Sequence, residues 1–166
     1  MLLFAIHQAL FVSGKQCGQP TKGKFMWTEI KEQTDIDTLL ELYGNFHDSC
    51  LRDIYISTRE FVDNELTMHF DNKLTASLLF QRQFEQATVL ELKFEDIERF
   101  NFIRFDNYEH TVILDATLIA TNELFYWADL AGWKIGNNDS VWICGKKLFW
   151  RLRPELIGDI KRINDY

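Results

Sequence analysis

The chain has 166 residues, of which 46% are hydrophobic and 14% aromatic, and its formal net charge is −7 at pH 7. This length predicts a single domain with its own core, and the apolar content excludes a disordered chain. The negative charge argues against nucleic-acid binding, which needs clustered lysine and arginine, and it favours basic partners.

Residues 1–25 are predicted to be an N-terminal extension that lies outside a single globular domain, residues 26–166. Their apolar run, MLLFAIHQALFV, is too short to span a bilayer and lacks the basic start of a signal peptide. A basic junction follows this run, and Met26 is then expected to be the first residue of the domain. Removing the extension's three lysines, with no acid lost, takes the net charge from −7 to −10.

The three cysteines, Cys17, Cys50 and Cys144, lie far apart and form no Cys-x-x-Cys pair. This spacing is typical neither of a disulfide framework nor of a zinc site, so reduced thiols and a cytoplasmic location are expected. No glycine-rich loop follows a strand and opens a helix, so no nucleotide fingerprint is present. The sequence therefore predicts no metal, no cofactor and no membrane contact.

A short helix is predicted at residues 35–44. The stretch Thr34-Asp35-Ile36-Asp37 resembles a capping box with Asp in place of Glu. Gly44 stands where a C-cap glycine belongs. One apolar face follows the helical period, with Ile36, Leu39, Leu40 and Tyr43.

After Gly44 the hydrophobic period changes to two, which is typical of strands. Strand-like runs occupy residues 65–70, 76–84, 90–94, 111–120, 123–129 and 141–152, with turn residues between them. Pro154 ends the last run, and the apolar residues that follow predict a short C-terminal helix. We therefore expect a mainly β fold, a two-layer antiparallel sheet or sandwich with a short helix at each end.

The segment YGNFHDSC holds His47, Asp48 and Ser49, the three side-chain types of a hydrolytic triad. Neighbours on an extended chain point to opposite faces, so these three cannot converge, and no G-x-S-x-G elbow is present. A structural hinge is the favoured interpretation: Asp48 or Ser49 binds backbone groups freed near Gly44, Phe46 packs into the core and His47 is at least half buried.

A catalytic alternative stays open, in which His47 or Asp48 works with a distant polar group. Asp115 is the main candidate, because it shares a strand face with β-branched residues that are either covered or partly open. Asp53, His69 and Arg82 are others, although His69 lies on the polar side of its strand. Under this alternative the protein is a hydrolase or a small-ligand binder.

Four of the five tryptophans lie in the C-terminal third of the chain. Trp133 falls in the loop LAGWKIGNNDS, where exposure and a role as binding anchor are expected, with Trp127 and Asp129 nearby. The alternative is that Trp133 folds back as a lid on the sheet. Alternate positions of the last strand-like run are predicted to lie on one face whose two ends belong to the core: Trp142, Cys144, Leu148 and Trp150.

Five segments carry a resemblance: MWTEIKEQTDIDTLLELYGNFHDSCLRDIYI, LLFQRQF, DATL, FYWAD and VWICGKKLFWR. Together they cover about residues 26–152 and resemble a family of small uncharacterised bacterial proteins, mostly from Gram-positive bacteria. The Phe-His-Asp-Ser segment is also similar to that of immunity-like proteins from bacterial toxin neighbourhoods. The resemblance implies a start near Met26 and no established activity, so it carries over no catalytic residue.

These observations favour a protein-binding module over an enzyme. The expected partner is a protein with a basic surface, and an immunity-type antagonist of a basic toxin is one form of this function. The hydrolase or ligand binder built on His47, Asp48 and Asp115 remains the alternative. A deep pocket that holds His47, Asp48 and a third titratable group would favour the alternative, whereas an acidic, convex or flat face that bears Trp133 would favour the binding module.

Overall fold

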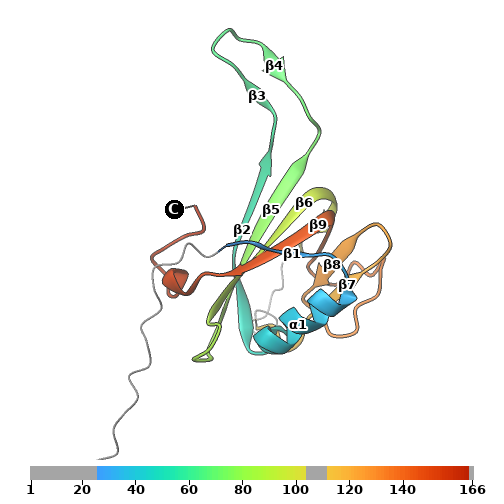
Figure 1. The fold of residues 1–166 in the computed structure, drawn as a ribbon, viewed down its shortest axis with the longest axis vertical. Helices are drawn as coiled ribbons and strands as arrows, with labels where there is room; N and C mark the ends of the chain where they lie inside the picture. The colour runs from blue at the N-terminus through green and yellow to red at the C-terminus, as the bar shows by residue number, and fades with distance from the viewer. Residues whose placement is uncertain (1–25, 104–111, 165–166) are drawn as a thin grey trace, which may run out of the picture.

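The computed structural model describes residues 26–103 and 112–164, which form a twisted antiparallel sheet with a helix at its lower end and an arm at its upper end (Figure 1). The N-terminal extension, Cys17 and the first residue of the predicted run at residues 111–120 lie outside the described residues. The elements are β1 (Thr28–Ile30), α1 (Gln33–Tyr43), the 3₁₀ turn η1 (Gly44–Phe46), β2 (Ser49–Thr58), β3 (Phe61–Val62), β4 (Met68–His69), β5 (Leu74–Arg82), β6 (Val89–Asn101), β7 (Thr117–Ala120), β8 (Phe125–Ala128), β9 (Trp142–Leu152) and the 3₁₀ turn η3 (Pro154–Leu156).

The strand pairing confirms the mainly β, antiparallel class. Seven strands form one sheet in the order β2-β5-β6-β9-β8-β7, with β1 paired to β9, and every pair is antiparallel. β3 and β4 form a separate two-stranded sheet. The predicted runs at residues 76–84, 90–94, 123–129 and 141–152 all join the large sheet, so the pairing yields one main sheet rather than a sandwich of two.

Helix α1 closes the core from one side of the sheet. It begins at Gln33, earlier than predicted, because the Asp35 carboxylate accepts the backbone N–H groups of Lys31 and Glu32. It ends as predicted at Gly44, whose left-handed backbone forms the C-cap. The buried core cluster combines helix, sheet and loop side chains, among them Ile36, Leu39, Tyr43, Phe46, Leu78, Phe80, Leu90, Leu92, Leu118, Trp127 and Leu148.

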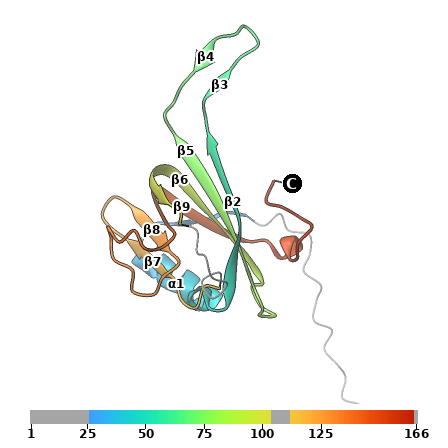
Figure 2. The ribbon, with the colours of Figure 1, turned by 180° about the vertical axis from the view of Figure 1, so that it is seen from behind.

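The opposite face of the sheet carries a smaller cluster formed by Leu79, Val89, Leu156 and Ile163. Because side chains alternate along a strand, Leu79 and Gln81 face this side while their neighbours Leu78 and Phe80 face the main core. We call it the outer face. Residues 154–164 cross it, and Figure 2 shows this C-terminal segment (red) running beside the upper part of the sheet.

Three sequence predictions need correction here. The C-terminal helix is only the short 3₁₀ turn η3, since Leu156 and Ile163 are buried on the sheet while Ile160 faces solvent. The run at residues 65–70 forms only the two-residue strand β4, outside the large sheet. The predicted single face of β9 is divided, because Trp142 and Cys144 belong to a second cluster while Leu148 lies in the main core.

None of the helices in the described part of the chain combines the length and the apolar character needed to span a membrane.

Candidate functional site

The hinge between α1 and β2 is built from backbone that most residues avoid. Gly44, Asn45, Phe46 and Asp48 all have positive φ, between 52° and 64°. The side chain of Phe46 is fully buried and packs edge-on against Phe80, with ring centroids 4.9 Å apart. This packing holds the strained turn in place and directs the chain into β2.

Ser49 makes the backbone contact that the hinge interpretation requires. Its hydroxyl is buried and donates a hydrogen bond of 2.6 Å to the carbonyl oxygen of Phe46. The backbone of Ser49 also pairs with Ile113, and the Ala116 N–H donates to the Asn45 carbonyl. The hinge is therefore tied both to itself and to residues 113–116.

His47 and Asp48 depart from expectation. The His47 side chain is 56% exposed, so the prediction that it is at least half buried is wrong. Its Nδ1–H donates to the Leu114 carbonyl at the surface, which leaves the rest of the ring in solvent. The Asp48 carboxylate is also exposed, 3.7 Å from His47 Nε2. Asp48 contributes through its left-handed backbone, which Asp tolerates better than most residues.

The groups of the catalytic alternative do not form a connected set in the described residues. There, no hydrogen bond or ion pair joins His47 or Asp48 to the distant candidates. Asp115 is exposed and lies in a bend before β7, because only Thr117–Ala120 of the predicted run at residues 111–120 form a strand; the prediction that it lies on a strand face is wrong. The other candidates have different partners: Asp53 binds arginines, His69 binds Asp63, and Arg82 donates to the carbonyls of Leu42, Gln86 and Ala87.

A pocket of about 500 Å³ lies beside the hinge. It is lined by Asp48, Ser49, Cys50, Gln81, Arg82, Gln83, Val112 and Ile157. His47 and Asp115 are not among these residues, and the Ser49 hydroxyl is bound to backbone. The pocket therefore lacks the acid–base pair that the hydrolase alternative needs.

Trp133 is 4% exposed, so its predicted exposure is wrong. Its Nε1–H donates to the Asn137 carbonyl, and its ring packs against Tyr126 and Trp142, as the lid alternative describes. Trp127 is fully buried in the main core.

Asp129, the third predicted binding residue, is half-buried and stabilises the loop that contains Trp133. Its Oδ1 accepts the backbone N–H of Val141, and burial raises the pKa of its carboxyl to about 6. Trp133 and Asp129 therefore hold the C-terminal loop, and Trp127 fills the main core, so these three residues present no contact surface.

The most exposed apolar surface lies where the sequence predicted an ordinary strand. Residues 59–73, which we call the arm, project from the sheet beyond β2 and β5 (Figures 1 and 2). Five large apolar side chains on the arm are between 54% and 84% exposed: Phe61, Val62, Leu66, Met68 and Phe70. Alternation alone could not reveal this, because it marks a strand without showing whether another layer covers it.

One carboxylate organises the tip of the arm. Asp63 Oδ1 accepts the backbone N–H groups of Glu65 and Thr67, and Oδ2 binds His69 Nε2 at 2.8 Å. The His69 bond and the Thr67 N–H hold the pKa of Asp63 below its usual value. The His69 ring is stacked on Phe61, with centroids 4.5 Å apart. The arm is thus ordered by its own contacts.

Comparisons of the chain with models of protein families, with curated proteins and with solved structures gave no match.

Proposed function

We propose that this chain is a protein-binding module, and that the arm is its contact element for a partner with a basic surface. The observation that carries the proposal is the set of five exposed apolar side chains on the arm. Clusters of exposed large apolar side chains on a monomeric protein often mark a binding site. Fully burying one such side chain contributes about 1.5–3 kcal/mol, so a few of them supply a substantial part of a binding free energy.

The shape of the arm indicates the kind of partner surface. A projecting hairpin offers apolar side chains on both of its sides, so a cleft covers more of them than a flat surface can. Asp63, His69 and Phe61 already order the tip, which reduces the conformational entropy that binding must remove. We therefore infer an apolar groove on the partner.

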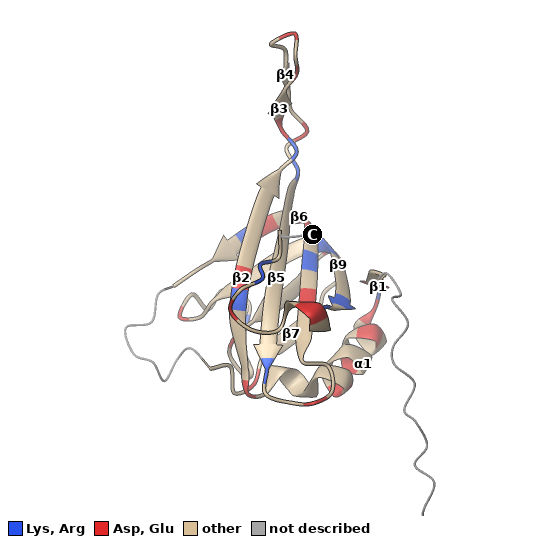
Figure 3. Cartoon of the chain, turned by 90° about the vertical axis from the view of Figure 1, so that its left-hand side faces the viewer, with Lys and Arg blue, Asp and Glu red and all other residues tan. Residues whose placement is uncertain are grey.

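The charge supports a basic rim around that groove. Four acids on the arm (Glu60, Asp63, Glu65 and Asp71) outnumber its two bases, Arg59 and Lys73. Figure 3 shows further acidic residues, in red, along α1. The chain as a whole carries a net charge of −7, which speeds encounter with a positive partner. An immunity-type antagonist of a basic toxin fits this pattern, and the Phe-His-Asp-Ser resemblance supports the same proposal.

The first experiment is capture from a bacterial lysate with the full-length chain and with a triple variant, Phe61→Ser, Met68→Ser and Phe70→Ser. A matched control is Ile135→Ser, which removes an apolar side chain that is 56% exposed but lies far from the arm in sequence. The proposal predicts a basic protein that the wild type and the control retain and the triple variant loses.

Capture alone does not support the proposal. The retained protein must also bind the purified chain directly, in an arm-dependent way. Equal retention by the triple variant, or an arm-dependent partner that is acidic, contradicts the proposed surface.

A further inference from the structure

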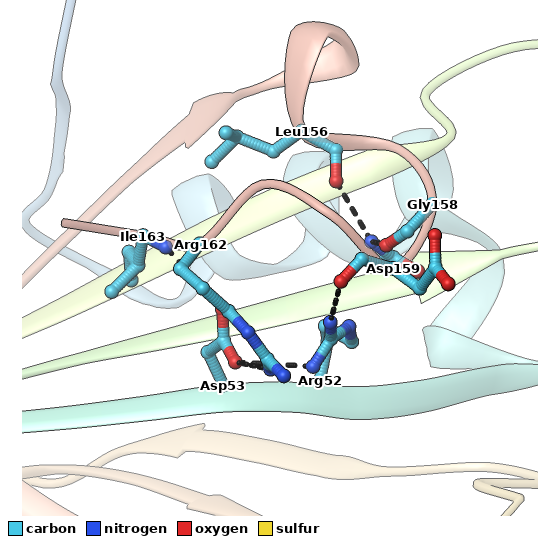
Figure 4. Close-up of polar contacts among 8 residues, drawn as sticks. Arg52, Asp53, Leu156, Gly158, Asp159, Arg162 and Ile163 are labelled. Carbon is cyan, nitrogen blue, oxygen red and sulfur yellow. Dashed lines mark hydrogen bonds and ion pairs between the residues drawn. The ribbon is translucent and has the colours of Figure 1, made fainter. Parts of the chain in front are cut away.

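The outer face of the sheet, away from the arm, holds an extended part of the chain. There residues 154–164 cross β5 and β2 with no strand pairing (Figure 4). Two apolar side chains anchor this C-terminal segment. Leu156 is fully buried and Ile163 nearly so, and both pack with Leu79 and Val89 of the sheet.

Between these anchors the sheet binds mainly the backbone of the segment. Gln81 Nε2 donates to the carbonyl oxygens of Leu156, at 2.8 Å, and Gly158, at 2.9 Å. One guanidinium nitrogen of Arg52 donates to the Asp159 carbonyl at 2.8 Å. Contacts of this kind do not depend on which side chains the segment carries.

Asp53 contacts a side chain of the segment as well as its backbone. Asp53 Oδ1 accepts from the Arg162 guanidinium at 2.6 Å, while Oδ2 accepts the backbone N–H of Ile163 at 3.3 Å. The Asp53 side chain is only 12% exposed, so it favours a cation at this position. Asp53 Oδ1 also lies 3.4 Å from Arg52 Nη1, so it has one cation from the sheet and one from the segment. The outer face thus contacts a basic residue that is followed by an aliphatic one.

A bulge in β2 makes this arrangement possible. Neighbouring residues on a regular strand point to opposite faces, yet both Arg52 and Asp53 reach the C-terminal segment. The register with β5 shifts between Leu51 and Asp53, so that Arg52 is the extra residue. Bulges re-aim side chains in this way and are frequent beside functional sites.

Two apolar side chains of the segment face solvent instead of the sheet. Ile157 and Ile160 are 53% and 87% exposed, so they contribute little to holding it. The pocket of about 500 Å³ continues along one side, lined by both Gln81 and Ile157.

We propose that the outer face between Gln81 and Asp53 is a peptide-binding groove, in which the chain's own C-terminal segment is the resident ligand. The external ligand that replaces it is an extended segment of a basic protein, with an aliphatic anchor and, further on, a cation–aliphatic pair. The charge of the chain disfavours a second copy as the donor, because two copies of net −7 repel each other. This groove is separate from the arm, so either proposal can fail without the other.

The test uses the full-length chain with Arg162→Ala and Ile163→Ala, which loosens the resident segment. The probe is a fluorescent synthetic peptide of residues 154–164, and its binding is followed by anisotropy. Tethering gives the resident segment an effective concentration of about the millimolar range, so the wild type should bind the probe at least about tenfold more weakly than the loosened variant.

Two controls establish where the probe binds. Adding Asp53→Asn to the loosened variant should weaken binding at least about tenfold, as should placing Glu at the Arg162 position of the peptide. The proposal is overturned if the loosened variant folds but does not bind the probe. It is also overturned if Asp53→Asn leaves the affinity for the probe unchanged. Dimerisation of that variant with rising concentration shows that a second copy is the ligand and overturns the assignment to a basic partner.

If the loosened variant does not fold, hydrogen exchange of the wild type tests whether the C-terminal segment can leave the sheet. The groove predicts that the Ile163 amide exchanges at least a hundredfold faster than core amides of β5 and β6, through local opening. If the Ile163 amide exchanges as slowly as those core amides, the C-terminal segment is an integral part of the fold and the proposal is overturned.

Discussion

Replacing Ser49 with Ala tests the hinge directly. The buried hydroxyl of Ser49 donates a 2.6 Å hydrogen bond to the Phe46 carbonyl, and Ala leaves that acceptor unpaired in the core. Leaving a buried group unsatisfied costs about 1–3 kcal/mol. For a chain of this size each kcal/mol lowers Tm by roughly 2–4 °C, so a loss of about 2–12 °C is expected.

Asp48 supplies the contrast, because its carboxylate is exposed and its backbone is left-handed at φ 52°. Asp48→Ala should cost less than about 1 kcal/mol, and Asp48→Gly should be neutral or stabilising, since glycine adopts positive φ freely. Urea unfolding of the three variants gives the order. A larger loss for Asp48→Ala than for Ser49→Ala would refute the assignment of the hinge contact to Ser49.

Three further predictions concern stability. Glu91→Gln should cost about 3–5 kcal/mol in urea unfolding, because the buried Glu91 carboxylate pairs with Arg151 and Arg153; a change below 1 kcal/mol would contradict this. Burial raises the pKa of Asp129 in the folded state to about 6, above its ordinary value of 3.8, so the contribution of Asp129 to stability should fall as pH rises from 4 to 6. Asp129→Asn should lessen that fall and match the wild type near pH 4, and an unchanged pH profile would exclude Asp129 as the source. A chain that starts at Met26 should melt within a few degrees of full length by calorimetry, and a large loss would show that residues 1–25 stabilise the domain.

The sequence predicted those parts of the fold whose signal is local. The face of α1 follows from its period, and its C-cap follows from Gly44, because only a residue that tolerates positive φ ends the helix this way. The hinge contact of Ser49 follows from the polar residues at a helix end. Strand β1, three residues long, is too short to leave a periodic signal.

Features that depend on tertiary context were missed. For Trp133 the sequence left exposure and a lid both open, and only the contacts with Tyr126 and Trp142 decide for the lid. The arm has the alternation of a half-buried strand, but no layer formed by residues 26–103 or 112–164 covers Met68 or Phe70. The apolar residues after Pro154 have the spacing of a helix, but the structure shows that Leu156 and Ile163 are instead separate contacts with the sheet. Periodicity identifies an apolar face and says nothing of what lies against it.

The central claim is that the arm binds a basic protein. The most direct measurement is the Kd of the captured partner for the wild type and for the Phe61→Ser, Met68→Ser, Phe70→Ser variant, by calorimetry at fixed salt. Losing three apolar anchors of about 1.5 kcal/mol or more each predicts a Kd at least about a hundredfold weaker, with an unchanged Kd for Ile135→Ser. A triple variant whose Kd stays within twofold of the wild type would contradict the account.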